Sequence, residues 1–384
     1  MQSRGAVVLR FWASVVAFHL VLVPAVLLVA RRQASRAGLP ARPWLAGLAR
    51  DGVLLSLTAA LAGAVVSAWA PMPGFTTLRL WCQALFGEGV LLCGWLAASQ
   101  ACRGRPGRAA LPAIAALGLV AVYWQAYHRE PQQLKVKRHE LRVAGGGGAR
   151  RLRILHVTDI QASTIGDHET RALRAGLVER PDLIVFTGDY IQERVGAGTA
   201  DTAARDFRAL IRTLRVDAPL GVFATDGDTG LDCATTFSGL PVRCLADACA
   251  AVERADGSRV AVAALASGTS RGRRPARTTE VLASCPPADV SFVMGHRPDF
   301  VANLVGREQV GFALAGHTHG GQVVLPLFGP PLTLSRLPRR FAADLNVYEG
   351  IPLHVSRGVG MERGTAPQIR FLCPPEICVL DVWY

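Results

Sequence analysis

Four long apolar stretches dominate the first 130 residues of this 384-residue chain, at residues 11–30, 53–70, 80–99 and 109–127. An α-helix rises about 1.5 Å per residue, so roughly 20 apolar residues cross a hydrocarbon core of ~30 Å. A cleaved leader would have one shorter apolar core with nothing comparable after it. The sequence therefore predicts a transmembrane anchor of four helices over residues 1–130, in contact with the bilayer.

The spans are expected to anchor the protein rather than to transport a solute. Polar residues within the apolar stretches are few, which disfavours a transporter or channel. Glu88 lies within the third stretch, and without ionisable partners in the spans it is interpreted as an anchor residue.

The formal net charge of +13 follows the same division of the chain. Residues 1–130 carry 12 Lys and Arg against 3 Asp and Glu, so most of the excess lies beside apolar stretches. Membrane orientation requires such flanking arginines, whereas a nucleic-acid groove requires a basic soluble surface. We therefore expect no nucleic-acid partner.

The arginines of the connections predict an orientation. The first connection carries five arginines, the second one and the third three. Because arginine concentrates on the cytoplasmic side, the first and third connections are expected there, and the following domain outside the cytoplasm. Arg4 and Arg10, before the first stretch, and Arg129, after the fourth, weigh against this orientation.

After residue 130 the pattern changes to short apolar runs typical of strands. Residues 134–143 and 152–157 flank a glycine run, which predicts a hairpin, with a flexible linker as the alternative. Residues 170–179 have a helical pattern, and further strands are expected at 183–186, 221–224, 290–294 and 310–314. Strands joined by helical crossovers predict an α/β domain over residues 131–384.

Acidic residues and histidines follow five of these strands. The residues concerned are Asp159, Asp189, Asp228, His296, His317 and His319. Parallel strands place such ends at one sheet edge, where ligands bind, so Asp159 and Asp189 are expected to be neighbours. Carboxylates and imidazoles without thiolate suit Mn, Fe or Zn. Two such ions sharing a carboxylate could clamp both oxygens of a phosphoryl displacement.

With these motifs, residues 132–384 resemble the calcineurin-like metallophosphoesterase family, especially its membrane-attached bacterial phosphodiesterase branch. The resemblance rests on HVTDIQ (156–161), TGDY (187–190), GHRPD (295–299) and GHTHGGQ (316–322), with residues 221–230, 325–330, 355–360 and 370–376. It implies an αββα sandwich of two mixed β-sheets and metal-dependent hydrolysis of a phosphomonoester or phosphodiester. An anchor would hold the site near the bacterial inner membrane, so a lipid-linked or envelope substrate is favoured.

The resemblance also implies which residues would bind each of two divalent metal ions. One ion would be held by Asp159, Gln161 and His319, the other by Asp228, His296 and His317, with Asp189 bridging them. Gln161 stands where the family has histidine, and its amide oxygen is the weaker ligand. Asp228 stands where the family has asparagine, and its added negative charge partly compensates.

Thr229 departs most from the family, which has there a histidine that is a candidate proton donor to the leaving group. A threonine hydroxyl has no useful pKa for that task, so the catalytic residue stays unassigned. Losing a general acid typically costs roughly 100-fold to 10,000-fold. Two hypotheses remain open: a slow enzyme or one acting on good leaving groups, and a catalytically impaired metal-binding or sensor protein.

Other polar residues receive weaker assignments. Arg357 is a candidate ligand of the substrate phosphate, and Arg297 is expected to be a solvated arginine. His156, His168 and His354 receive no role. Six cysteines follow residue 130 without paired C-x-x-C spacing, so disulfides of unknown connectivity are allowed and a structural zinc site is not expected. The oligomeric state is not predicted.

Overall fold

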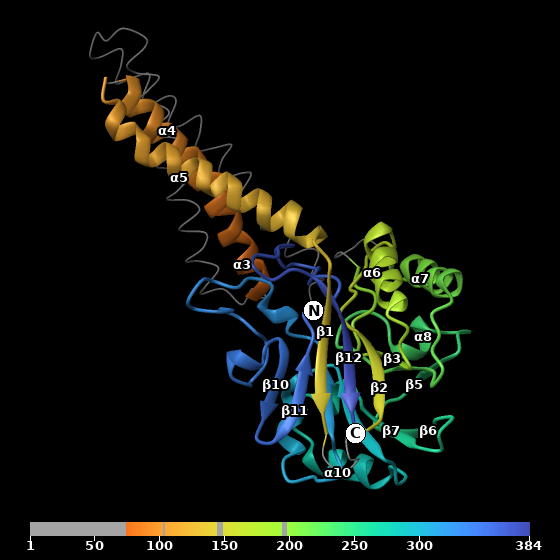
Figure 1. The fold of residues 1–384 in the computed structure, drawn as a ribbon. Coiled ribbons are helices and arrows are strands. Elements are labelled where there is room, and N and C mark those ends of the chain that lie inside the picture. Colours follow the sequence, from red (N-terminus) through yellow and green to blue (C-terminus); the bar gives the residue numbers. More distant parts are fainter. Residues whose placement is uncertain (1–73, 103, 144–148, 194–197) are drawn as a thin grey trace, which may run out of the picture. The chain divides into compact units, whose positions relative to one another are not determined.

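The computed structural model describes residues 74–102, 104–143, 149–193 and 198–384. The chain divides into two compact units, drawn in Figure 1. One comprises residues up to Gln125 with Thr365–Pro367, and the other comprises Ala126–Gly364 with Gln368–Tyr384. The predicted apolar helices at residues 11–30 and 53–70 lie outside the described residues, and a domain boundary at residue 130 stays a prediction.

The described part of the first unit is helical. It contains α3 (Gly74–Gln83), the π-helix η1 (Ala84–Glu88), α4 (Gly89–Cys102) and α5 (Pro106–Trp124). Two helical stretches, Trp81–Ala98 and Pro106–Gln132, are long and apolar enough to cross a membrane. They coincide with the third and fourth predicted spans. The structure thus describes two candidate spans, where the sequence predicts four.

The second unit is built on two mixed sheets of six strands each (Figure 1). The first sheet has the order β1-β12-β2-β3-β4-β5, with β1 (Lys135–Arg142), β12 (Glu376–Trp383), β2 (Arg151–Val157), β3 (Leu183–Phe186), β4 (Val222–Ala224) and β5 (Val242–Cys244). The second has the order β10-β11-β9-β8-β7-β6, with β10 (Asp344–Tyr348), β11 (Ile351–Val355), β9 (Phe312–Ala315), β8 (Val290–Gly295), β7 (Arg259–Leu265) and β6 (Ala248–Glu253). These two sheets confirm the predicted α/β class.

Alternating side chains explain the layers of this unit. In β2, Leu155 and Val157 belong to the same core as the buried faces of α6 (Asp167–Val178) and α7 (Ala200–Leu214). The intervening Ile154 belongs to the core formed with strands of the second sheet. Because successive side chains of a strand point to opposite faces, the central strands are apolar on both. The outer face of the second sheet packs with α10 (Pro275–Ala283) and the 3-10 helix η4 (Pro298–Asn303).

The remaining helices are short. They are α8 (Cys233–Thr236), α9 (Ser267–Ser270), η2 (Gln125–Arg129), η3 (Glu130–Gln132), η5 (His319–Gly321) and η6 (Arg339–Phe341).

The predicted hairpin at the start of the domain is wrong. β1 and β2 are not paired with each other, because β12 lies between them, parallel to β1 and antiparallel to β2. β12 is almost entirely buried, so it requires a strand partner on each edge. The pairing of β1 and β2 is therefore set by the C-terminal strand β12, which lies between them, and not by the glycine run that joins them.

Two disulfides join cysteines of the second unit, Cys233 with Cys244 and Cys249 with Cys285. Such bonds persist in oxidising compartments, which agrees with a domain outside the cytoplasm. Cys373 and Cys378 are buried thiols.

Candidate metal centre

The loops after five parallel strands bring the predicted ligands together. Asp159, Asp189 and Asp228 follow β2, β3 and β4 of the first sheet, His296 follows β8, and His317 and His319 follow β9 of the second. Ligand atoms of Asp159, Asp189 and His296 all lie within 4.8 Å of one another, as do those of Asp228, His296 and His317. His296 thus belongs to both groups. We call the seven predicted ligands, including Gln161, the strand-end centre.

Most residues of the strand-end centre have an unusual backbone. Asp159, Gln161, Asp189, His317 and His319 have φ between 42° and 69°, in the left-handed region. A residue other than glycine typically pays about 1–3 kcal/mol for a sparsely populated conformation, and such residues cluster at functional sites. These five residues follow β2, β3 and β9, where the chain bends sharply out of the strand.

Two glycines let the backbone approach the carboxylates. A Cβ on Gly227 would lie 2.0 Å from Oδ1 of Asp189, the oxygen that accepts a hydrogen bond from the Asp228 amide at 2.8 Å. A Cβ on Gly316 would lie 2.2 Å from Oδ2 of Asp159. Any side chain at these positions would displace the carboxylate. The absence of a side chain at these glycines leaves room for backbone amides to bond one oxygen of each aspartate, from Asp228 to Oδ1 of Asp189 and from His317 to Oδ2 of Asp159 at 2.9 Å.

Three buried atoms of the strand-end centre have no hydrogen-bond partner: Oδ1 of Asp159, Oε1 of Gln161 and Nε2 of His319. They come from the same three residues that the family resemblance assigns to one metal. Nε2 of Gln161 donates to Oδ2 of Asp189 at 3.0 Å, which identifies the unpartnered atom as the amide oxygen. An unsatisfied buried polar atom costs about 1–3 kcal/mol, and a divalent ion would remove that cost at all three. The residues present therefore fit a metal ion.

The second group presents lone pairs toward a common point. Nδ1 of His296 bonds the Thr187 carbonyl at 2.9 Å, so this nitrogen is the donor and Nε2 is the acceptor. Nε2 of His317 faces the Leu334 carbonyl at 3.3 Å, which leaves Nδ1 as the acceptor, 3.2 Å from Nε2 of His296. Oδ1 of Asp228 lies 3.4 Å from the same Nε2. Acceptors this close require a proton or a metal ion among them.

The pKa values report the same crowding of acceptors. Burial raises the pKa of Asp159 to about 7, although His296 opposes this shift. Burial alone would lower the pKa of His296, but the charge of Asp189 and hydrogen bonds to Asp189 and Asp228 hold this pKa well above its usual value. Burial would raise the pKa of Asp228, yet its hydrogen bond to His296 keeps that pKa well below its ordinary range. Positive charge is therefore strongly favoured at this point.

Arginines surround the centre in ways the sequence did not indicate. Arg297, expected to be solvated, holds Oδ2 of Asp228 through Nε at 2.7 Å and Nη2 at 2.6 Å. Arg370 is fully buried, donates to the Arg357 carbonyl at 2.7 Å and lies 3.5 Å from Nδ1 of His319. Its only sequence signal was its place in one of the stretches that carry the resemblance.

Two further residues complete the surroundings. The guanidinium of Arg357 pairs with Asp344 at 2.8 Å, so its contact with a substrate phosphate stays a proposal. Oε2 of Glu362 accepts from the Gln161 amide at 3.3 Å. Sequence analysis missed Glu362, which lies in no recognisable motif.

Thr229 lies where the family places its histidine. Its amide donates to Oδ1 of Asp189 at 3.0 Å, and its hydroxyl oxygen is buried without a hydrogen-bond partner. The backbone of this position is thus part of the centre, while its side chain offers no proton donor of suitable pKa.

Comparison with known proteins supports the resemblance. No protein-family model matches the chain. The uncharacterized metallophosphoesterase YkuE of Bacillus subtilis (strain 168) is 28% identical over 276 residues, covering 68% of this chain and 89% of the relative. The phosphodiesterase YaeI of Escherichia coli (strain K12) is 26% identical over 275 residues, covering 67% of this chain and 91% of the relative. The chain is a distant homologue of both, and the family resemblance is confirmed at that level.

Proposed function

We propose that this metallophosphoesterase-like protein is a metal-dependent phosphoesterase that hydrolyses a phosphomonoester or a phosphodiester. The observation that carries the proposal is the gathering of buried carboxylate and imidazole ligand atoms of Asp159, Asp189 and His296 within 4.8 Å of one another, with Nε2 of His319 3.4 Å from Oδ1 of Asp159. Its distant homology to a metallophosphoesterase and a phosphodiesterase supports the same reaction class.

Two divalent ions, of Mn, Fe or Zn, would be held by the strand-end centre. Asp159, Gln161 and His319 are the proposed ligands of one ion, and Asp228, His296 and His317 of the other, with Asp189 between them. When bound, such ions supply Lewis acidity and an activated water for phosphoryl transfer.

The chain's own residues orient this chemistry. The backbone amides of Asp228 and Thr229 donate to Oδ1 of Asp189, and the side-chain amide of Gln161 donates to Oδ2. These bonds fix the orientation of the proposed bridging carboxylate. The Arg297 guanidinium holds Oδ2 of Asp228 through Nε and Nη2, so it orients this proposed ligand. Arg357 is the proposed ligand of the substrate phosphate.

The proton for the leaving group has no evident source at Thr229. An alkoxide leaves slowly without protonation, whereas an acidic alcohol or phenol leaves as its anion. We therefore expect esters with good leaving groups to be hydrolysed faster, relative to alkyl esters, than in a relative with histidine at this position.

The substrate proposal rests on the first unit. Leu111, Ile114 and Leu117 of α5 are all more than 60% exposed, an apolar surface that a bilayer would cover. We propose that this unit anchors the protein in a bacterial inner membrane, with the second unit outside the cytoplasm, where its disulfides are stable. A lipid-linked or envelope phosphate ester then lies within reach.

The direct test is hydrolysis of bis(p-nitrophenyl) phosphate by the full-length protein in detergent, stripped with EDTA and reloaded with Mn²⁺, Fe²⁺ or Zn²⁺. We expect turnover that requires metal and disappears in Asp189→Asn. Turnover that is unchanged by chelation, or that survives this substitution, would refute the mechanism.

The alternative is a metal-binding or sensor protein with an impaired centre, motivated by Thr229 and Gln161. It predicts that the protein binds metal at the strand-end centre but shows no turnover on any aryl ester. Metal analysis on the same samples separates this alternative from a protein that fails to load metal.

A further inference from the structure

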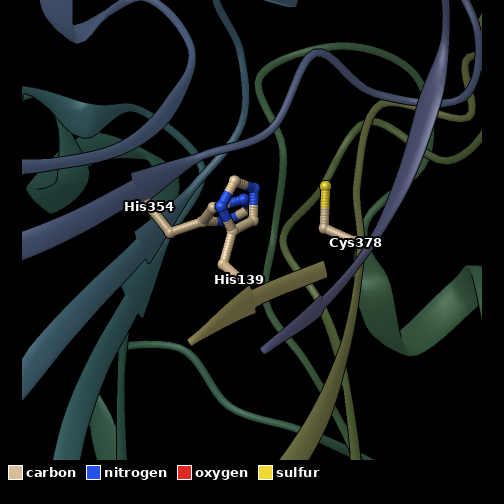
Figure 2. A group of neighbouring side chains, drawn as sticks. All are labelled: His139, His354 and Cys378. Carbon is tan, nitrogen blue, oxygen red and sulfur yellow. The ribbon is translucent and has the colours of Figure 1, made fainter. Parts of the chain in front are cut away.

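A second group of metal-ligating side chains lies away from the strand-end centre. One ring nitrogen each from His139 and His354 and the sulfur of Cys378 all lie within 4.8 Å of one another. Figure 2 shows the two imidazole rings against each other, with the thiol beside them. We call these three residues the inter-sheet cluster, because His139 on β1 and Cys378 on β12 belong to the first sheet and His354 on β11 belongs to the second.

Strand register explains why the three side chains meet. Cys378 is the Cα partner of Lys137 on one side and of His156 on the other, and His139 lies two residues after Lys137 on the same face. Cys378 packs in the core shared by the two sheets, so this face of β1 and β12 looks toward β11. A single histidine of β11 then completes the group from the opposite sheet.

Both histidines offer a buried atom with no partner. Nε2 of His139 and Nε2 of His354 make no hydrogen bond, and His354 is fully buried. Nδ1 of His354 lies 3.0 Å from Nδ1 of His156, whose Nε2 contacts the Thr187 hydroxyl at 2.8 Å. If His156 donates to Thr187, His354 donates to His156, and Nε2 of His354 is left as a free lone pair. A histidine held by its second ring nitrogen in this way is typical of metal ligands.

Burial keeps both histidines in the neutral state that a metal needs, but it also keeps the Cys378 thiol protonated, so an ion must displace that proton to bind. Burial lowers the pKa of His139 and places that of His354 well below its usual value, so both imidazoles are neutral near pH 7. The Cys378 thiol points toward Oε1 of Glu376 at 3.5 Å, and burial raises its pKa. A metal ion would replace that thiol proton, and one proton would leave to solvent for each ion bound.

We propose that His139, His354 and Cys378 bind a soft or borderline transition-metal ion, Zn²⁺ or Cu⁺, that links the two sheets. Two imidazoles and one thiolate are ligands these ions favour, unlike the oxygen-rich strand-end centre. Ligand atoms around a tetrahedral zinc ion lie about 3.4–3.6 Å apart, so the three side chains would close by up to about 1 Å on binding the ion. The absence of C-x-x-C spacing led us to expect no structural zinc site, but ligands from three separate strands leave no such spacing in the sequence.

Cobalt titration of the full-length protein tests this proposal separately from the phosphoesterase chemistry. A thiolate bound to Co²⁺ gives a strong near-ultraviolet charge-transfer band, and the strand-end centre contains no cysteine. We expect this band in the wild-type protein, its loss in Cys378→Ser and its weakening in His139→Gln. Cys373→Ser is the matched control, because Cys373 is also a buried thiol but lies near His319, to whose carbonyl it donates at 3.2 Å.

Metal analysis after loading with Zn²⁺ or Cu⁺ then identifies the ion, with one equivalent fewer expected in Cys378→Ser than in Cys373→Ser. Circular dichroism and metal-dependent hydrolysis of the same variants show that the chain still folds and that the strand-end centre still loads. A wild-type protein without the charge-transfer band at saturating Co²⁺, or a band that persists in Cys378→Ser, would overturn the proposal. Loss of hydrolysis with the band intact would instead affect only the proposed function.

Discussion

The strand-end centre and the inter-sheet cluster both contain histidines, but those of the first lie in loops or at strand ends and those of the second lie within regular strands. His317 and His319 lie in a loop with left-handed φ values of 69° and 50°, whereas His139 and His354 lie within regular strands. The loop needs glycines and a fixed order of residues, and it therefore leaves a motif in the sequence. The strands need only register, so a cluster on them leaves no local pattern.

The two groups meet at one residue. The Thr187 hydroxyl contacts Nε2 of His156, and the other ring nitrogen of His156 forms a hydrogen bond with His354. The carbonyl of the same Thr187 contacts Nδ1 of His296 at 2.9 Å. Each group thus orients a histidine through the same short loop after β3. We expect the two groups to bind different metals, although the loop after β3 supports a histidine of each, His296 directly and His354 through His156. Variants in one group show whether the other responds.

The largest effect is expected from Asp189→Asn, which removes the charge at the centre of the seven proposed ligands. Loss of a residue that merely orients a ligand typically costs 10-fold to 100-fold, so loss of the bridging carboxylate should lower kcat/KM by more than about 100-fold. Steady-state hydrolysis of bis(p-nitrophenyl) phosphate at saturating metal measures this effect.

The same variant also tests the independence of the inter-sheet cluster. Its thiolate–cobalt band should be unchanged, because Asp189 contacts none of the three cluster residues among its described hydrogen bonds and ion pairs. Joint loss of hydrolysis and of the band would show that the two groups form one cooperative site.

Much of the second unit could be predicted from the sequence because its parallel strands are buried on both faces. The run at residues 183–186 coincides with β3, and the turn signals after it carry Asp189. The neighbouring positions of Asp159 and Asp189 followed from strand order alone. Ligand roles beyond that depended on family resemblance, since a lone Gly-Asp after a strand is usually a turn.

The rest required contacts between residues far apart in the chain. The hairpin was wrong because β12, more than 200 residues later, pairs with both β1 and β2. Arg370 looks like an ordinary basic residue until it is seen buried among carbonyls. His354 received no role because its partner His156 is 198 positions away. Nothing within a local window distinguishes these residues.

Gly227→Ala tests how far the strand-end centre depends on its close backbone. The new Cβ would lie 2.0 Å from Oδ1 of Asp189, so the carboxylate must move, at a cost of about 1–3 kcal/mol in unfolding free energy. The metal concentration needed for half-maximal hydrolysis should rise as well, because Asp189 is a proposed ligand. Gly166→Ala is the control, because a Cβ there would meet its nearest atom at an ordinary 3.8 Å. Equal effects of the two substitutions would contradict the close-packing argument.

Thr229→His should restore the missing proton donor and so increase turnover. A general acid typically contributes roughly 100-fold to 10,000-fold, and a grafted histidine should recover a part of that, about tenfold. The gain should be larger for alkyl phosphate esters than for p-nitrophenyl esters, since only the alkoxide needs protonation. Thr229→Asn, which offers an amide without a titratable proton, is the matched control. A similar gain for both ester classes would mean that the substitution acts through binding rather than through proton transfer.

The smallest effect is expected at an ion pair outside both groups, which supplies a baseline for their response to chelation. Arg153 holds Asp381 through two hydrogen bonds of 2.8 and 2.9 Å, which lower the pKa of this carboxyl from its usual 3.8. A lowered pKa stabilises the folded state above pH 4, and this contribution is lost as the pH falls through the folded-state value. Asp381→Asn should therefore reduce the unfolding free energy by up to about 1 kcal/mol at pH 7, and by progressively less below pH 4. Urea unfolding with and without EDTA should give the same difference, because this pair binds no metal. A difference that changed with EDTA would mean that the first sheet transmits metal binding as far as its β2–β12 pairing, and the two groups could no longer be treated as local.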